Sequence, residues 1–182
     1  MSRKSTFRRD VVEHIFQSLL AFITLTLILS APAPSAIAVG EPVLAPLVVK
    51  DLKAKLVQPG IKASVLNLWA TWCAPCIKEM PELVKFRKSH SAQGMQLILL
   101  SADGKDDIKD AAAFLSKQGV DFPVYILGQE PDDFMKSLVP GWPAVVPTTL
   151  VFDQNGNRVA YFAGEIKFKE LEAKLAPLLK GH

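Results

Sequence analysis

Residues 68–81 read Leu-Trp-Ala-Thr-Trp-Cys-Ala-Pro-Cys-Ile-Lys-Glu-Met-Pro, and they contain both cysteines of the chain, Cys73 and Cys76. The mostly apolar run at 63–70, which leads into them, is typical of a buried strand in an α/β sheet. Apolar residues follow the cysteines at roughly helical spacing, with charged residues largely between them. The pattern therefore predicts a strand, a short turn and a helix that begins at the cysteine pair.

Cys73 is expected at the N-terminus of this helix, where free backbone N–H groups and the helix dipole favour a thiolate. Because the thiolate is the attacking species in disulfide exchange, Cys73 is the predicted nucleophile. Cys76 lies about one turn further on, so it is expected to be more covered and to resolve the mixed disulfide. Pro75 suits the first turn because its missing N–H costs nothing there.

Two alternatives to a redox-active cysteine pair remain open. A zinc site needs two further ligands, but the chain has no second cysteine pair and its three histidines are scattered. A structural disulfide would usually join distant segments, because longer closed loops give more stabilisation. The sequence therefore favours a redox-active Cys73–Cys76 disulfide, with no metal and no other cofactor.

The stretch 68–81 resembles the active-site segment of thioredoxin-like proteins, and more narrowly that of the extracytoplasmic TlpA/ResA-type thiol–disulfide oxidoreductases. A second stretch, Val-Pro-Thr-Thr-Leu-Val-Phe-Asp at 146–153 followed by Gln-Asn-Gly-Asn at 154–157, resembles the family's cis-proline, strand and hairpin. The likeness covers roughly residues 45–180. It implies an α/β fold, namely a thioredoxin-like three-layer α/β/α sandwich around a central mixed sheet.

The resemblance also implies roles for residues around the cysteines. Pro147 would be cis and packed against the disulfide, which leaves the Val146 backbone free to pair with an extended substrate strand. Trp72 would shield the sulfurs and offer apolar contact to a client, and Ala74 and Pro75 would lie in the same substrate-binding surface. The other tryptophan of the motif, at position 69, is expected in the core.

Glu79 lies one helical turn after Cys76, where a glutamate of ResA-like proteins lies near the active site and influences thiol ionisation. Our hypothesis is that Glu79 accepts a proton from the resolving thiol, and the alternative is a solvated glutamate on the helix face. The buried aspartate of cytoplasmic thioredoxins is replaced here by Asn67. An amide cannot shuttle protons, so Glu79 or water would have to do so.

The rest of the chain alternates between strand and helix patterns, which fits the same architecture. Helices are predicted at 47–58, 106–118, 131–139 and 167–179, and strands at 95–100, 122–127, 149–153 and 158–162. The segment 101–142 corresponds to the TlpA-like insertion between the active-site helix and the cis-proline. Trp142, at its end, is expected near the redox site, where it either helps to recognise a partner or packs. The aspartates at 103, 106, 107, 132 and 133 are interpreted as helix caps and solvated faces.

Residues 1–38 have the organisation of a secretory signal, with basic residues, an apolar stretch at 15–29 and a small-residue site ending at Ala38. The alternative is an uncleaved membrane anchor through residues 15–30, although the strongly apolar core is shorter than the roughly 20 residues that span a bilayer. Both predictions place the thioredoxin-like domain, 39–182, in the periplasm or outside the cell, free or anchored to the inner membrane.

The charge of the chain gives no case for nucleic-acid binding. The whole chain has a net charge of +3, and the leader contributes four basic and two acidic side chains, so the mature part is near +1.

The predicted function is an extracytoplasmic thiol–disulfide oxidoreductase that mainly reduces disulfides of client proteins. No histidine lies between the cysteines, where one could stabilise the thiolate and make a strong oxidant. A reductase in an oxidising compartment must receive electrons across the membrane, so a thiol donor of the DsbD/CcdA type is implied. The resemblance suggests apocytochrome c, as in cytochrome c maturation, or copper-site proteins as clients. A disulfide oxidase or isomerase, and a copper-binding or docking module without turnover, remain alternatives.

Overall fold

The structure is a computed structural model that describes residues 42–180. Its centre is a six-stranded sheet with the order β1-β4-β3-β2-β5-β6. The strands are β1 (Leu44–Leu47), β2 (Ala63–Trp69), β3 (Met95–Ser101), β4 (Val124–Leu127), β5 (Thr148–Asp153) and β6 (Arg158–Ala163). The helices are α2 (Val49–Leu56), α3 (Ala74–His90), α4 (Ile108–Lys117), α5 (Pro131–Leu138) and α6 (Phe168–Lys180), with the short 3-10 turns η1 (Ser91–Gln93) and η2 (Lys105–Asp107).

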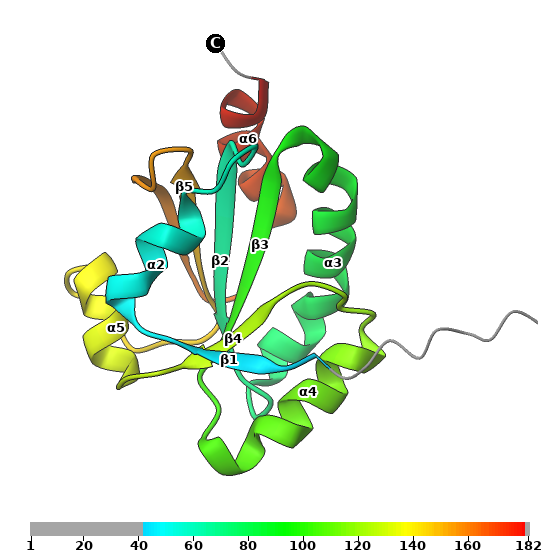
Figure 1. The fold of residues 1–182 in the computed structure, drawn as a ribbon, viewed down its shortest axis with the longest axis vertical. Coiled ribbons are helices and arrows are strands. Elements are labelled where there is room, and N and C mark those ends of the chain that lie inside the picture. The colour runs from blue at the N-terminus through cyan, green and yellow to red at the C-terminus, as the bar shows by residue number, and fades with distance from the viewer. Residues whose placement is uncertain (1–41, 181–182) are drawn as a thin grey trace, which may run out of the picture. The chain divides into compact units, whose positions relative to one another are not determined.

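Helices cover both faces of the sheet, α3, α4 and α6 on one side and α2 and α5 on the other (Figure 1). β2 lies between them, and every one of its residues is buried. Because successive side chains of a strand point to opposite faces, Val65 and Trp69 pack with the first group of helices, and Leu66 and Leu68 pack with the second. A strand buried on both faces reads as a nearly continuous apolar run, which explains the pattern at 63–70.

The sheet is mixed. β2 pairs in parallel with β3 and in antiparallel fashion with β5, and β5 pairs with β6 in an antiparallel hairpin. The hairpin turns at the predicted Asn-Gly dipeptide, where Gly156 adopts φ +80° and donates its N–H to the Asp153 carbonyl. The predicted α/β/α sandwich with a mixed sheet is therefore confirmed, including the strand and helix inserted before the cis-proline.

One boundary prediction is wrong. The helix expected to begin at position 47 begins at Val49, and the residues before it form β1, which pairs in parallel with β4. This edge strand has four residues, and its exposed middle pair, Ala45 and Pro46, breaks the alternation that marks a strand. The other predicted elements are present, with ends that move by at most two residues.

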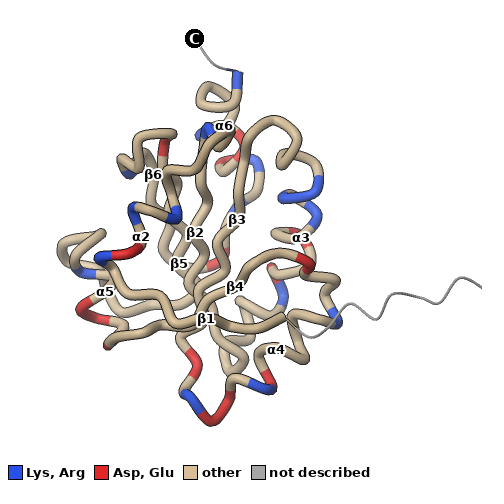
Figure 2. The backbone as a smooth tube through the Cα atoms, viewed as in Figure 1, with Lys and Arg blue, Asp and Glu red and all other residues tan. Residues whose placement is uncertain are grey.

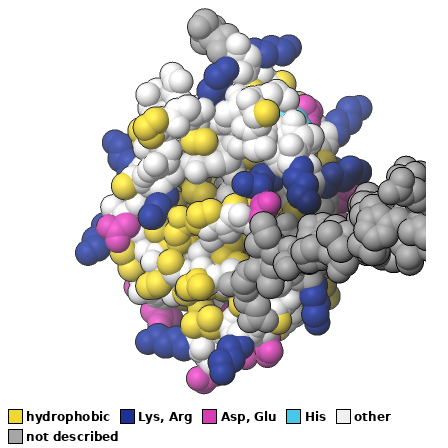
Figure 3. Space-filling view, turned by 45° about the vertical axis from the view of Figure 1, so that its right-hand side comes forward, with side chains coloured by type: hydrophobic (Ala, Val, Ile, Leu, Met, Phe, Trp, Pro, Cys, Tyr) yellow, Lys and Arg dark blue, Asp and Glu magenta, His cyan; other side chains and the backbone are white. Residues whose placement is uncertain are grey.

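Charged residues lie mainly on the helices and loops, with Asp153 and Arg158 at the ends of β5 and β6, and the central strands β2 and β3 carry none (Figure 2). In the space-filling view, Lys and Arg side chains are spread around the outline of the face shown, with Asp and Glu between them (Figure 3). Among residues 42–180, no helix is both long and apolar enough to cross a membrane. The predicted leader, 1–38, lies outside the described residues.

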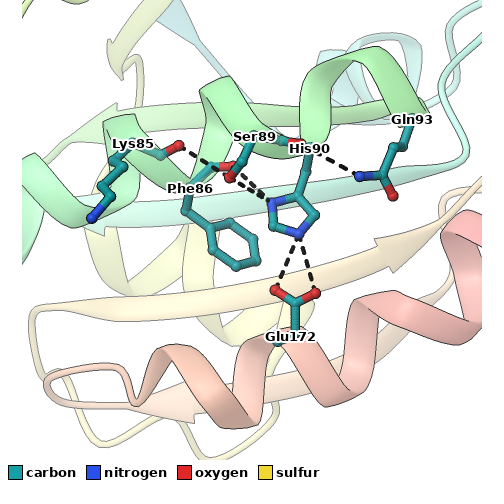
Figure 4. A network of polar contacts seen from close by, with 6 residues as sticks. All are labelled: Lys85, Phe86, Ser89, His90, Gln93 and Glu172. Atoms are coloured by element: carbon teal, nitrogen blue, oxygen red, sulfur yellow. Dashed lines mark hydrogen bonds and ion pairs between the residues drawn. The ribbon is translucent and has the colours of Figure 1, made fainter.

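The far end of α3 is tied to α6 by a contact that lies outside the cysteine motif (Figure 4). The His90 ring stacks on Phe86, with ring centroids 4.1 Å apart, and its Nδ1 lies 2.9 Å from the Phe86 carbonyl oxygen. Its Nε2 lies 3.1 Å from a carboxylate oxygen of Glu172 on α6. The contact gives His90 a structural place in the fold, at the opposite end of α3 from the cysteines.

The motif lies where β2 and β3 end. Trp69 and Ser101, the last residues of these strands, are register partners, and Ala102 N–H donates to the Trp69 carbonyl over 2.8 Å. The carboxyl ends of parallel strands meet at one edge of a sheet, so the turn after β2 and the loop after β3 are neighbours. The cysteine motif therefore lies at this edge of the sheet, next to the loop after β3.

Candidate functional site: a cysteine pair at a helix N-terminus

Cys73 and Cys76 form a disulfide, with the sulfurs 2.04 Å apart. Cys73 occupies the N-cap position of α3, and its Sγ accepts a hydrogen bond from Cys76 N–H at 3.3 Å. The Cys73 N–H donates to the Ala70 carbonyl over 3.2 Å, which closes the turn between β2 and α3. Cys73 Sγ therefore occupies the place of an N-cap acceptor, at the free N–H groups of the first helical turn.

The two sulfurs differ in cover. Cys73 is 5 % exposed and Cys76 is fully buried. The residues bordering Cys73, namely Trp72, Ala74 and Pro75, are exposed, and Trp72 is 65 % exposed. Cys76 is therefore the more covered of the two cysteines, as the sequence predicts.

The Val146–Pro147 peptide bond is cis, as expected from the resemblance. Pro147 is buried, and the half-buried Val146 packs against the apolar cluster that contains both cysteines. The Pro147 carbonyl accepts the N–H of Gly164 over 2.8 Å, so the loop after β6 holds the proline segment from the other side. Pairing between Val146 and a substrate strand stays a prediction.

Glu79 is buried, with 3 % of its surface exposed, so the alternative of a solvated glutamate is wrong. Its Oε1 accepts from Asn67 Nδ2 over 2.9 Å, and its Oε2 accepts from Ile166 N–H over 3.0 Å. Burial raises the pKa of the Glu79 carboxyl above its ordinary value, the hydrogen bonds from Ile166 and Asn67 oppose that rise, and nearby Glu165 adds to it. The result is a carboxylate inside the protein that binds a proton more readily than usual.

Asn67 joins the elements around Glu79. Its Nδ2 donates both to Glu79 on α3 and to Thr149 Oγ1 on β5, the latter over 3.0 Å. Its Oδ1 is buried and has no hydrogen-bond partner within residues 42–180. One amide hydrogen bond therefore holds the buried carboxylate against β2, and the other ties Asn67 to β5.

Trp142 is 6 % exposed and belongs to the apolar cluster on the α2 and α5 side of the sheet. Its Nε1–H donates to Thr148 Oγ1 over 3.1 Å, and Thr148 Oγ1 donates to the Val145 carbonyl over 2.6 Å. These contacts favour the packing alternative over partner recognition. Through Thr148, the indole is linked by hydrogen bonds to the residues on either side of the cis-proline segment, Val145 and Thr148.

Sequence reasoning missed Asp103. The interpretation as a cap or solvated residue is wrong, because Asp103 is 6 % exposed and its carboxylate accepts hydrogen bonds from Thr71 in the turn before Cys73 and from Ser101. One signal for this contact is present in the sequence: a serine ends the strand that neighbours the motif strand, and an aspartate, Asp103, follows that serine, Ser101, by two residues.

The profile of the Redoxin family matches residues 47–175 of the chain. The chain belongs to the Redoxin family. Within that family it is 34 % identical, over 127 residues, to the thiol-disulfide oxidoreductase ResA of Bacillus thuringiensis (strain Al Hakam), an alignment that covers 69 % of this chain and 65 % of ResA. It is 32 % identical over 121 residues to the thiol:disulfide interchange protein HelX of Rhodobacter capsulatus, covering 66 % of this chain and 62 % of HelX.

The chain thus spans just under two thirds of the length of these two relatives. Among solved structures, a thiol:disulfide interchange protein of the thioredoxin family from Chlorobium tepidum TLS superposes with a TM-score of 0.60 at 24 % identity, covering 82 % of this chain and 99 % of that one. This likeness shows the fold. Together, the comparisons confirm that this Redoxin-family chain is a thioredoxin-like protein of the TlpA/ResA type.

Proposed function

We propose that the protein is a thiol–disulfide oxidoreductase that reduces disulfides of client proteins through Cys73 and Cys76. The observation that carries the proposal is the difference between the two sulfurs. Cys73 caps α3 beside exposed side chains, and Cys76 is fully buried one turn further in. Cys73 can meet a client, and Cys76 can meet only Cys73.

The reaction begins with both cysteines reduced. The Cys73 thiolate, stabilised by the N-terminal N–H groups of α3, attacks one sulfur of a client disulfide. The client disulfide breaks, its other sulfur leaves as a thiolate that takes a proton from solvent, and Cys73 is bonded to the client. Cys76 then loses its proton and attacks Cys73. The client leaves with two thiols, and the two electrons it has gained leave Cys73–Cys76 oxidised, which is the state of the structure.

Glu79 is the proposed acceptor of the Cys76 proton. It lies one helical turn after Cys76 on α3, and it is buried, so water competes poorly for the proton. A buried carboxylate with a raised pKa is a better base than an exposed one. Asn67 cannot itself accept the proton, and its part is to hold the carboxylate in place.

The same proposal includes the direction of the reaction and the cellular compartment in which it takes place. The absence of a histidine between the cysteines favours reduction over oxidation. The signal-like leader supports a reaction outside the cytoplasm, where a membrane thiol donor of the DsbD/CcdA type would return electrons to the pair. Disulfide-bonded apocytochrome c or copper-site proteins are the proposed clients, and the cysteine disulfide is the only redox group required.

The test measures activity and potential together. The full-length protein is expected to reduce insulin disulfides, to lose this activity in Cys73→Ser, and to accumulate a mixed disulfide with its client in Cys76→Ser. Its equilibrium with glutathione is expected to give a reduction potential of the Cys73–Cys76 disulfide near those of thiol reductases, about −230 to −270 mV. A potential near that of strong oxidases, about −120 mV, would reverse the proposed direction. If the reduced protein exchanged with no disulfide, the proposed function would be wrong.

A further inference from the structure

Asp103 reaches across from the end of β3 to the turn that carries the nucleophile. Its Oδ1 accepts from Thr71 N–H over 2.9 Å and from Thr71 Oγ1 over 2.6 Å, and its Oδ2 also lies 3.2 Å from Thr71 N. Its Oδ2 accepts from Ser101 Oγ over 2.7 Å, and Ser101 Oγ in turn accepts the Asp103 N–H over 3.0 Å. One buried carboxylate therefore satisfies both donors of Thr71, two residues before Cys73.

These contacts are not those of a helix cap. The 3-10 turn and the helix that follow Asp103 are capped by Gly104 and Asp107, and neither receives a side-chain cap hydrogen bond. The carboxylate accepts hydrogen bonds from the β2–α3 turn, and it caps neither the 3-10 turn nor the helix that follows. Burying a carboxylate is costly unless hydrogen bonds compensate, and here Thr71 and Ser101 supply them.

The turn has few other anchors. Trp72 is 65 % exposed, and the backbone hydrogen bond from Cys73 N–H to the Ala70 carbonyl is 3.2 Å long. Thr71 lies between Ala70 and Trp72, and its hydrogen bonds go to Asp103, which lies outside the turn. A shift of Thr71 would be passed directly to Trp72 and to the N-cap position of Cys73.

We propose that Asp103 is a positioning residue of the redox site, which sets the turn at 70–73 so that Trp72 is presented to the client and Cys73 Sγ is held at the N-terminus of α3. The inference rests on the proposed function for its biological meaning, and its physical content is the reactivity of one sulfur. Because a displacement of about 1 Å can cost a reaction 100-fold, release of Thr71 is expected to slow the attack by Cys73 roughly tenfold.

The test compares three full-length variants in the reduced state, at a temperature where each is folded. Asp103→Ala removes the acceptor, and Asp103→Asn keeps a neutral oxygen that can still accept from Thr71. The matched control is Ser64→Ala, near the opposite end of β2. It removes two hydrogen bonds of a buried serine, the one that Ser64 Oγ donates to the Leu56 carbonyl over 3.2 Å and the one that it accepts from Gln96 Nε2 over 2.7 Å. Two rates are measured: insulin reduction, and alkylation of Cys73 by iodoacetamide in a Cys76→Ser background across pH.

Asp103→Ala is expected to lower both rates roughly tenfold, Asp103→Asn to recover most of the loss, and Ser64→Ala to stay within about twofold of the parent protein. Adding Thr71→Val to Asp103→Ala is expected to slow neither rate further, since both changes remove the same contact. The inference is overturned if Asp103→Ala leaves Cys73 alkylation unchanged or slows it no more than Ser64→Ala does. A parent protein that reduces no disulfide, but whose Cys73 alkylation still depends on Asp103, would reject the proposed function and keep this inference.

Discussion

Asn67 Nδ2 lies 2.9 Å from Glu79 Oε1, and this hydrogen bond joins the central strand of the sheet to the helix that carries the cysteines. The carboxylate it holds is buried, with a raised pKa, one helical turn from Cys76. A strand amide and a helix carboxylate, twelve residues apart in sequence, thus make a small polar centre inside an otherwise apolar layer.

Replacing Glu79 with Gln is expected to slow the second half of the reaction. Gln keeps an oxygen for one hydrogen bond but cannot accept the Cys76 proton, so release of the client is expected to slow by about 100-fold, the lower end of what positioned proton transfer contributes. Single-turnover release from a preformed Cys73 mixed disulfide measures this step. Glu82→Gln, at an exposed position of the same helix, is the control. An unchanged release rate in Glu79→Gln would remove Glu79 from the mechanism.

The same substitution is expected to change how stability depends on pH. The folded pKa of Glu79 is raised by burial, so the protonated form is favoured in the folded state. The stability that this provides is fully present below the ordinary glutamate pKa, about 4.3, and is lost as the pH rises through the folded pKa. Relative to Glu79→Gln, the oxidised parent protein should therefore become progressively less stable on going from pH 4 to neutral pH, as measured by urea unfolding. A constant difference between the two across this range would show that the raised pKa is not linked to folding.

Asn67→Asp is expected to place a second carboxylate about as close to Glu79 as the amide now is. Two buried like charges cannot both ionise cheaply, so one pKa of the pair rises and the fold loses about 3 kcal/mol at pH 7. The loss should shrink toward pH 5 as the pair keeps one proton. Urea unfolding of Asn67→Asp and Asn67→Ala at both pH values checks this. Equal pH dependence in the two variants would contradict the predicted coupling.

Substitutions of the two tryptophans of the motif are expected to have different effects, one on the stability of the fold and the other on the reaction with a protein client. Trp69→Ala removes a fully buried ring and is expected to cost about 3–5 kcal/mol. Trp72→Ala changes an exposed residue, so stability should stay within about 0.5 kcal/mol, while exchange with a protein disulfide slows more than exchange with glutathione disulfide. Thermal unfolding and parallel rate measurements distinguish the two effects. Equal slowing with both disulfides would mean that Trp72 makes no contact specific to a protein client.

Much of this molecule follows from local patterns in the chain. The apolar run at 63–70, the Cys-Ala-Pro-Cys spacing and the Asn-Gly turn each depend on neighbouring residues only, and they predict the motif strand, the N-cap position of Cys73 and the β5–β6 hairpin. The short strand β1 was not predicted because four residues on a sheet edge show too little periodicity. Its pairing with β4, some eighty residues away in sequence, stabilises it as a strand.

By itself, the sequence determined which two sulfurs lie together at a helix N-terminus and which of them is more covered, because helix capping and burial along one helix are short-range properties. Only the tertiary structure decided what surrounds them. The places of Glu79, Asp103 and Trp142 depend on β2 and β3 ending side by side and on β5 lying against β2. A carboxylate has the same sequence signature whether water or a neighbouring strand surrounds it. The burial of Glu79 and the hydrogen bonds from Thr71 to Asp103 are therefore decided only when the chain folds.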